Sequence, residues 1–331
     1  MTQKPAVTRK KRKPSDEPPC AARTRRAARI FYGRMRTPRY ILRASVIKYH
    51  ALASSQTESG VFVQRAIAVL DSGVGGLTVV KEIMRQLPGE PILYFGDTAR
   101  APYGPRPAHE VIRFTCEIVD DLLRFRPKMI VVACNTATAL ALDEIRKRSP
   151  TPVVGVIDPG ARAAAARTKS NVIGVIGTEG TIRSGAYQAA LRRLSPRVRV
   201  VQLACPAFVP LVEAGKFDSP EAYEVVARSL APLKGCGLDT LILGCTHYPF
   251  LARTISEFMG PEVTLISSAE EAGREVGAVL RGSGMLAASR GPIMHRFFCS
   301  GDPRKFREIA RLWLGESCRR IPTVWQERSV G

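Results

Sequence analysis

The chain has 331 residues, of which 45% are hydrophobic and 24% charged, and this composition excludes a disordered or fibrous protein. Eight cysteines are too few for a disulfide-stapled scaffold of this length, and no apolar segment is typical of a signal peptide or a membrane span. We therefore expect a cytoplasmic protein with reduced thiols and two α/β domains, since a domain takes roughly 150 residues.

The net charge of +21 is concentrated at the N-terminus, where residues 1–64 hold fifteen Lys and Arg but only three acidic residues. This region contains the run Arg9-Lys10-Lys11-Arg12-Lys13 and shows no apolar period. It is expected to be a basic, disordered extension. The alternative is an arm that binds nucleic acid or an anionic membrane, because clustered cations release counterions from phosphates.

From Ile67 onward, short apolar runs end in polar or glycine-rich turns and alternate with helical segments. Such runs are typical of buried parallel strands with helices on both faces. The predicted strands are 67–70, 91–95, 129–133, 152–157, 172–176, 198–203, 240–243 and 263–266.

The two halves of this series repeat one plan. Cys134 follows the apolar run 129–133, and Cys245 follows the run 240–243, with a threonine one or two residues later in each case. Ligands bind beyond the carboxyl ends of strands in open parallel sheets. Two similar domains that face each other would therefore place the two thiols on opposite sides of one cleft.

Two opposed thiols can invert a stereocentre without a cofactor, because one removes the α-proton as a thiolate and the other returns a proton to the opposite face. A cysteine near a helix N-terminus is expected to have a lowered pKa. A single cysteine after an apolar strand is usually inert core, but two in matching positions favour the catalytic interpretation.

The remaining chemistry-bearing residues are less specific. The other six cysteines are interpreted as structural, and no cysteine or histidine spacing is typical of a metal site. The turn Gly73-Val74-Gly75-Gly76 lacks the third glycine of a dinucleotide motif, since Thr78 occupies that position.

Asp71 is either a functional acid or a helix cap. His247 lies two residues after Cys245, where an imidazole could tune the protonation of the thiol.

Several motifs together resemble the glutamate racemases of the aspartate/glutamate racemase superfamily over residues 67–315. The motifs begin at Asp71-Ser72, at Tyr94, from which the motif runs to Pro102-Tyr103-Gly104, and at Cys134-Asn135-Thr136, Gly177-Thr178, Cys205-Pro206, Gly244-Cys245-Thr246-His247 and Ser300-Gly301-Asp302. Their order and spacing are together highly specific.

The resemblance implies two similar α/β domains with mainly parallel sheets flanked by helices, related by a pseudo-two-fold axis, with the active site between them. The first domain would comprise 65–161 and 266–316, the second 162–265, and 317–331 would form a tail. The implied activity is cofactor-independent interconversion of L- and D-glutamate, which supplies D-glutamate for peptidoglycan.

In this family pattern Cys134 acts on D-glutamate and Cys245 on L-glutamate, assisted by Asp71, His247 and Glu213, the last of which orients the histidine. The implied substrate contacts are Asp71, Ser72, Tyr103, Gly104, Asn135, Thr136, Thr246 and His247. No metal is expected, and the expected partner is glutamate itself, with a monomer or homodimer as the assembly. No membrane is expected to bind, and nucleic acid is expected to bind only through the basic extension.

Two other functions fit parts of the sequence. An aspartate racemase is disfavoured because such enzymes typically carry Glu after Gly-Cys-Thr, where this chain has His247. A nucleic-acid-binding protein on a racemase scaffold would use the basic extension as its arm, but retention of both thiols, Asp71, Glu213 and His247 favours catalysis.

Overall fold

The computed structural model describes residues 65–287, 293–315 and 323–328. The expectations for residues 1–64, and those for the remainder of the predicted tail, lie outside this part of the chain. The strands are β1 Ile67–Asp71, β2 Ile92–Gly96, β3 Met129–Val132, β4 Val153–Gly155, β5 Val172–Gly177, β6 Arg199–Ala204, β7 Thr240–Gly244, β8 Thr264–Ser267, β9 His295–Cys299 and β10 Thr323–Glu327. The helices are α1 Leu77–Gln86, α2 Ala108–Leu123, α3 Asn135–Arg148, α4 Ile157–Arg167, α5 Glu179–Ser184, α6 Ala186–Leu194, α7 Phe208–Glu213, α8 Pro220–Leu230, α9 Ala252–Met259, α10 Ser268–Gly282 and α11 Pro303–Leu314, with short 3₁₀ helices η2 Ala231–Leu233 and η3 Tyr248–Leu251.

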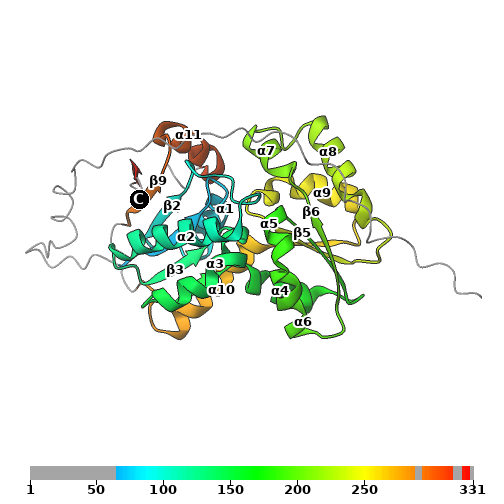
Figure 1. The fold of residues 1–331 in the computed structure, drawn as a ribbon, viewed down its shortest axis with the longest axis horizontal. Coiled ribbons are helices and arrows are strands. Elements are labelled where there is room, and N and C mark those ends of the chain that lie inside the picture. The colour runs from blue at the N-terminus through cyan, green and yellow to red at the C-terminus, as the bar shows by residue number, and fades with distance from the viewer. Residues whose placement is uncertain (1–64, 288–292, 316–322, 329–331) are drawn as a thin grey trace, which may run out of the picture. The chain divides into compact units, whose positions relative to one another are not determined.

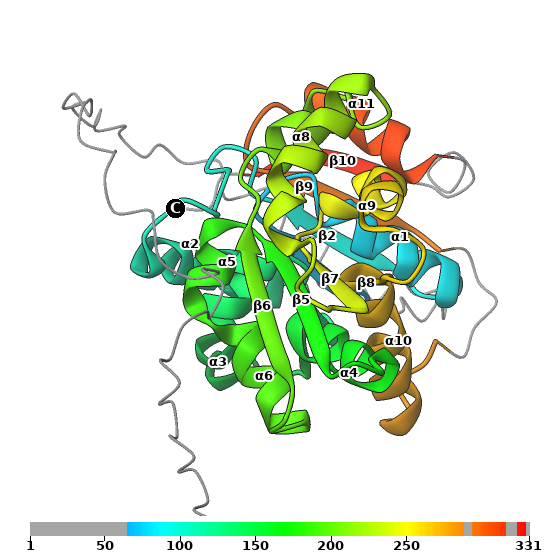
Figure 2. The same ribbon diagram turned by 90° about the vertical axis from the view of Figure 1, so that its right-hand side faces the viewer.

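The strands form two sheets in which every pairing is parallel. The first sheet has the order β10-β9-β2-β1-β3-β4, and the second has the order β6-β5-β7-β8 (Figures 1 and 2). Every residue of β1, β2, β3 and β7 is buried, as expected for central strands with helices on both faces. The prediction of two mainly parallel sheets flanked by helices is confirmed.

The internal repeat is visible in the strand order. Within the first sheet β2-β1-β3-β4 has the same arrangement as β6-β5-β7-β8 in the second. The register agrees as well, because Leu70 pairs with Val132 in one sheet and Ile176 pairs with Leu243 in the other. Cys134 lies two residues after Val132, and Cys245 lies two residues after Leu243. The two thiols therefore occupy equivalent positions.

Two helices cross between the halves. Helix α4 follows β4 of the first sheet but packs against α6 and β7 of the second half. Helix α10 follows β8 of the second sheet but packs against α1 of the first half. The expected boundaries at 161/162 and 265/266 therefore fall inside α4 and inside β8, which continues to Ser267.

The C-terminal part of the chain extends the first sheet. Strand β9 pairs with β2, and β10, which the sequence analysis assigned to a tail, pairs with β9 at the edge. After β10, the Arg328 guanidinium donates to Asp121 Oδ1 on α2 at 2.6 Å. Within the described residues, every helix is too short or too polar to cross a membrane.

Candidate active site

A pocket lies between the carboxyl ends of the strands in the two halves. The first half contributes Ser72, Tyr103, Gly104, Cys134, Asn135 and Thr136, and the second half contributes Glu213, Cys245, Thr246 and His247. All of these were predicted from the sequence, and the structure brings them together. Asp71, the remaining predicted residue, lies just beneath them, fully buried at the end of β1.

Cys134 caps helix α3, and its surroundings keep it neutral. The Ala137 backbone N–H donates to Sγ at 3.4 Å, and the thiol donates to Ser72 Oγ at 3.5 Å. Burial, together with the nearby Asp71 carboxylate, raises the pKa of Cys134 to about 12. The position of Cys134 at a helix N-terminus predicts a lowered pKa. That expectation was wrong for this structure, because loss of hydration and a neighbouring acid outweigh the backbone N–H.

Asp71 does not cap the following helix, since Gly76 occupies the cap position of α1. Its Oδ2 instead accepts a hydrogen bond of 2.9 Å from the Gly73 backbone N–H, which shapes the glycine turn. Burial raises the pKa of Asp71, and the nearby His247 opposes part of this rise. Its other oxygen, Oδ1, has no hydrogen-bond partner among the described residues. Asp71 is thus hydrogen-bonded to the glycine turn of the first half and lies near enough to His247 of the second half for their charges to interact.

Cys245 has a different neighbour. It directly follows β7, ahead of the short helix η3, and its Sγ lies 3.8 Å from His247 Nδ1. The opposite ring nitrogen, Nε2, lies 3.1 Å from Glu213 Oε1. Burial alone lowers the pKa of His247, but the contacts with Cys245 and Glu213 outweigh it and raise the pKa to about 10. The hydrogen bond with His247 in turn lowers the pKa of Glu213. An imidazolium therefore sits beside the second thiol.

Several predicted substrate contacts already have protein partners for their side chains. The Tyr187 hydroxyl donates to Asn135 Oδ1 at 2.7 Å, and the Thr136 hydroxyl lies 2.8 Å from that of Thr178. The Tyr103 hydroxyl donates to Asp97. These residues therefore shape the pocket wall and leave their backbone groups as the candidates for binding a substrate.

Five further residues line the pocket but were not predicted as site residues, although Pro102 and Thr178 stand in the motifs of the family resemblance: Gly73, Ala101, Pro102, Thr178 and Val209. Thr178 could have been found from the repeat, since it lies two residues after Ile176 as Ser72 lies two residues after Leu70. The other four contribute backbone or apolar surface, and the chemistry of their side chains does not mark them as site residues. No group of three or more His, Cys, Asp or Glu within the described ranges is arranged to hold a metal ion.

Comparisons with known proteins agree with this geometry. The Asp/Glu/Hydantoin racemase family matches residues 67–276. A glutamate racemase from Bacillus cereus is 52% identical over 266 residues, covering 80% of this chain and 99% of that protein. The crystal structure of a glutamate racemase isoform from Bacillus anthracis is 48% identical, with a TM-score of 0.75, covering 78% of this chain and 96% of that one.

A second solved structure, the glutamate racemase of Francisella tularensis in complex with D-glutamate, is 32% identical with a TM-score of 0.74. It covers 81% of this chain and 98% of that chain. The family match includes strands β1 to β8 and every residue that lines the pocket. The chain therefore belongs to the glutamate racemases of the Asp/Glu/Hydantoin racemase family and is an amino-acid racemase.

Proposed function

We propose that this protein interconverts L- and D-glutamate by a two-base mechanism in which Cys134 and Cys245 exchange a proton with the substrate. One observation carries the proposal: two cysteines at equivalent positions of a repeated fold line one pocket. A pair of thiols related in this way supplies a proton acceptor and a proton donor on opposite sides of a bound α-carbon.

The proton balance is simple. A thiolate takes the α-proton and becomes a thiol, leaving a planar carbanion conjugated with the α-carboxylate. The opposite thiol gives its proton to the other face and becomes a thiolate. The stereocentre is inverted, no electron is lost or gained, and the enzyme is left with its protonation pattern reversed.

The two thiols have different neighbours. The raised pKa of Cys134 supports its action as the proton donor at neutral pH. The imidazolium of His247 stabilises the negative charge on Cys245 when this sulfur acts as the base. When Cys245 is the thiolate and Cys134 the thiol, the enzyme accepts L-glutamate, and one turnover reverses this pattern and prepares the enzyme for D-glutamate.

The proposal extends to binding and biological setting. Asp71, the Ser72 and Thr246 hydroxyls, and the backbone groups of Tyr103, Gly104, Asn135, Thr136 and His247 would hold the ammonium and two carboxylates. The domains would be 65–161 with 266–316, and 162–265. We infer a cytoplasmic enzyme, active as a monomer or homodimer, whose D-glutamate serves peptidoglycan synthesis; the family resemblance supports this role.

The test is circular dichroism of L-glutamate, and separately of L-aspartate, incubated in D₂O with purified protein. Loss of the glutamate signal with one deuterium at Cα is expected, while aspartate keeps its signal. A response to aspartate alone would reassign the substrate. Retention of both signals would contradict the proposed activity.

The roles of the thiols are tested with Cys134→Ser and Cys245→Ser. Each variant should lose racemisation yet keep the far-ultraviolet dichroism of the parent, because serine preserves the packing but is a much weaker acid and base. Cys116→Ser, on α2 and outside the pocket, is the matched control and should remain active. Substantial turnover by either pocket variant would refute the two-thiol scheme.

A further inference from the structure

The segment between β2 and α2, residues 97–107, forms part of the pocket wall, and we call it the pocket loop. Ala101, Pro102, Tyr103 and Gly104 of this loop line the pocket. No strand or helix holds these residues. Their placement must therefore come from side-chain and loop contacts.

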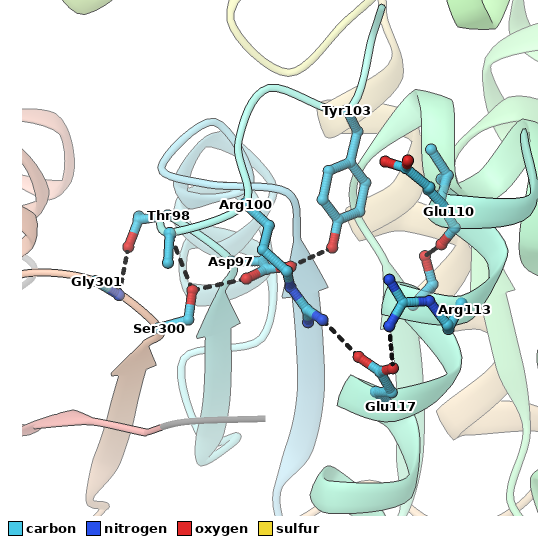
Figure 3. A network of polar contacts seen from close by, with 12 residues as sticks. Asp97, Thr98, Arg100, Tyr103, Glu110, Arg113, Glu117, Ser300 and Gly301 are labelled. Carbon is cyan, nitrogen blue, oxygen red and sulfur yellow. Dashed lines mark hydrogen bonds and ion pairs between the residues drawn. The ribbon is translucent and has the colours of Figure 1, made fainter. Parts of the chain in front are cut away.

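The base of the pocket loop is held by Asp97, which is fully buried. The Tyr103 hydroxyl and the Arg100 Nε both donate to Asp97 Oδ2, the latter at 2.7 Å (Figure 3). Burial and the charge of Asp97 raise the pKa of Tyr103, so its phenol remains a donor. Arg100 is held in turn by Glu117 on α2. The carboxylate thus fixes the side chain of a pocket residue directly.

The other oxygen of Asp97 is held from a distant part of the chain. The Ser300 hydroxyl, immediately after β9, donates to Asp97 Oδ1 at 2.6 Å and accepts from the Ala99 backbone N–H at 3.0 Å (Figure 3). Next to it, the Gly301 N–H donates to Thr98 Oγ1 at 3.0 Å. Ser300 therefore ties both ends of the Asp97-Thr98-Ala99 turn to the end of β9.

The far end of the pocket loop contacts the second half of the molecule. The Gly104 carbonyl accepts a 2.8 Å hydrogen bond from the Gly180 N–H at the start of α5. A Cβ on Gly104 would lie 2.8 Å from Thr178 Cβ, so the two segments approach more closely than a larger residue would allow. The pocket loop is thus held at one end by the hydrogen bonds of Ser300, which we call the brace, and at the other end by the contact between Gly104 and Gly180. A shift of Asp97 would therefore also move Tyr103 and Gly104.

We propose that Asp97 and Ser300 are positioning residues for substrate binding, which act by holding the pocket loop against the pocket. The proposal rests on the proposed function for its kinetic consequences. Neither residue lines the pocket, and Ser300 lies beyond residues 67–276, which the family match covers. The C-terminal segment that adds β9 to the first sheet would thereby act on the site through one hydroxyl group.

The two thiols are positioned by the ends of β3 and β7 and not by the pocket loop, so loosening the loop should weaken binding more than proton transfer. For Ser300→Ala we expect KM for glutamate to rise roughly tenfold, the size of a lost hydrogen bond to a charged group, with kcat changed less than about twofold. Asp97→Asn should raise KM at least as much. Ser300→Thr keeps the hydroxyl and should restore a KM close to that of the parent.

Matched controls are Ser283→Ala, which removes a hydroxyl bonded to the end of α10, and Asp143→Asn, on the exposed face of α3. Both should leave KM and kcat unchanged. Parental kinetics in Ser300→Ala and Asp97→Asn would refute the proposal. Equal losses of kcat in the alanine and threonine variants of Ser300 would also refute it, since they would indicate a general structural role.

Hydrogen exchange followed by mass spectrometry tests the brace independently of the substrate. In Ser300→Ala, the amides of 98–106 should exchange faster than in the parent, while those of β3 and β7 keep their rates. Unchanged exchange in 98–106 would refute the brace even if the protein proved to act on another amino acid. A parent that does not racemise glutamate but shows the faster loop exchange in Ser300→Ala would refute only the proposed function.

Discussion

At the scale of single residues, two buried histidines have pKa values shifted in opposite directions. His247 has a pKa of about 10 because its contacts with Cys245 and Glu213 outweigh its burial. His295 has a pKa of about 4 because burial is unopposed, and its Nδ1 accepts from the Ile92 backbone N–H at 3.1 Å. One ring is therefore charged at neutral pH and the other is neutral.

Nuclear magnetic resonance of ¹⁵N-labelled histidine checks this prediction, since the chain contains only four histidines. His247 should titrate near pH 10 and His295 near pH 4, with signals assigned by His→Gln variants. In Glu213→Gln the pKa of His247 should fall, because a hydrogen bond to a carboxylate is lost. Titration of both rings near the ordinary value of about 6.5 would contradict the prediction.

The same shifts determine how these histidines affect stability. The folded state binds the His247 proton more tightly than the unfolded chain, so this contribution is complete below about pH 6.5 and is lost as the pH rises towards 10. For His295 the sign is reversed, and stability is lost as the pH falls from about 6.5 towards 4. Urea unfolding across pH should give a smaller alkaline loss in Glu213→Gln than in the parent.

Gly75 permits a close approach between the two sides of the pocket. A Cβ at this position would lie 2.2 Å from Thr246 Oγ1 and 2.6 Å from the His247 ring. Gly75→Ala should therefore displace His247 from Cys245 and lower kcat/KM at least about tenfold, a loss of about 1.4 kcal/mol of transition-state stabilisation. Gly89→Ala, where nothing lies within 4 Å, should have parental kinetics. Steady-state racemisation of both variants checks this, and equal activities would contradict it.

At the scale of elements, a buried ion pair joins the amino ends of the first sheet. Lys128 precedes β3 and contacts Glu90, which precedes β2; their side chains are 7% and 2% exposed. The Lys128 ammonium also donates to the Met285 carbonyl at 2.9 Å, and Glu90 accepts from the Ala287 N–H at 2.7 Å. The pair thus attaches the chain after α10 to the first sheet.

Lys128→Met should lower the free energy of unfolding by about 3–5 kcal/mol, because it leaves Glu90 charged and buried without its cation. The double variant Lys128→Met, Glu90→Gln should recover part of this loss. As a control, Arg85→Met breaks an exposed pair with Glu82 and should cost under about 1 kcal/mol. Urea unfolding of the three variants measures these free energies. Equal losses of unfolding free energy in the single and double Lys128 variants would contradict this interpretation.

At the scale of the whole described region, the two sheets are bound into one unit by the helices that cross between them. Helix α4 packs on β7, and α10 packs on α1. Hydrogen bonds between the halves add to this, including that from the Thr78 hydroxyl to the Thr246 carbonyl at 3.0 Å. Unfolding the second half would uncover α4, and unfolding the first half would uncover α10.

We therefore expect the two sheets to unfold in a single transition. Hydrogen exchange at increasing urea should give β3 and β7 the same midpoint, within error, as the global transition followed by circular dichroism. Separate midpoints for the two strands would show that the halves are independently stable.

The sequence by itself determined β1 to β8 and the repeat, whereas β9 was not predicted and β10 was assigned to a tail. The site residues were predicted from the two matching cysteines and from the family resemblance. Continuous apolar runs such as 129–133 specify strands buried on both faces, and matching positions of Cys134 and Cys245 follow from chain order alone. Both signals are local or periodic, and parallel topology then forces strand ends to the same edge. This is why Asp71, Glu213 and His247 could be named, through the family resemblance, before the pocket was seen.

Only the tertiary structure decided the features that depend on distant segments meeting. The raised pKa of Cys134 arises from burial and from Asp71, 63 positions earlier in the chain, whereas the local helix N-terminus predicted the opposite sign. The contact between Ser300 and Asp97 joins residues 203 positions apart. The crossing of α4 and α10 between the halves depends on packing between distant elements. Desolvation and long-range contacts belong to the folded environment of a group, which no local sequence pattern encodes.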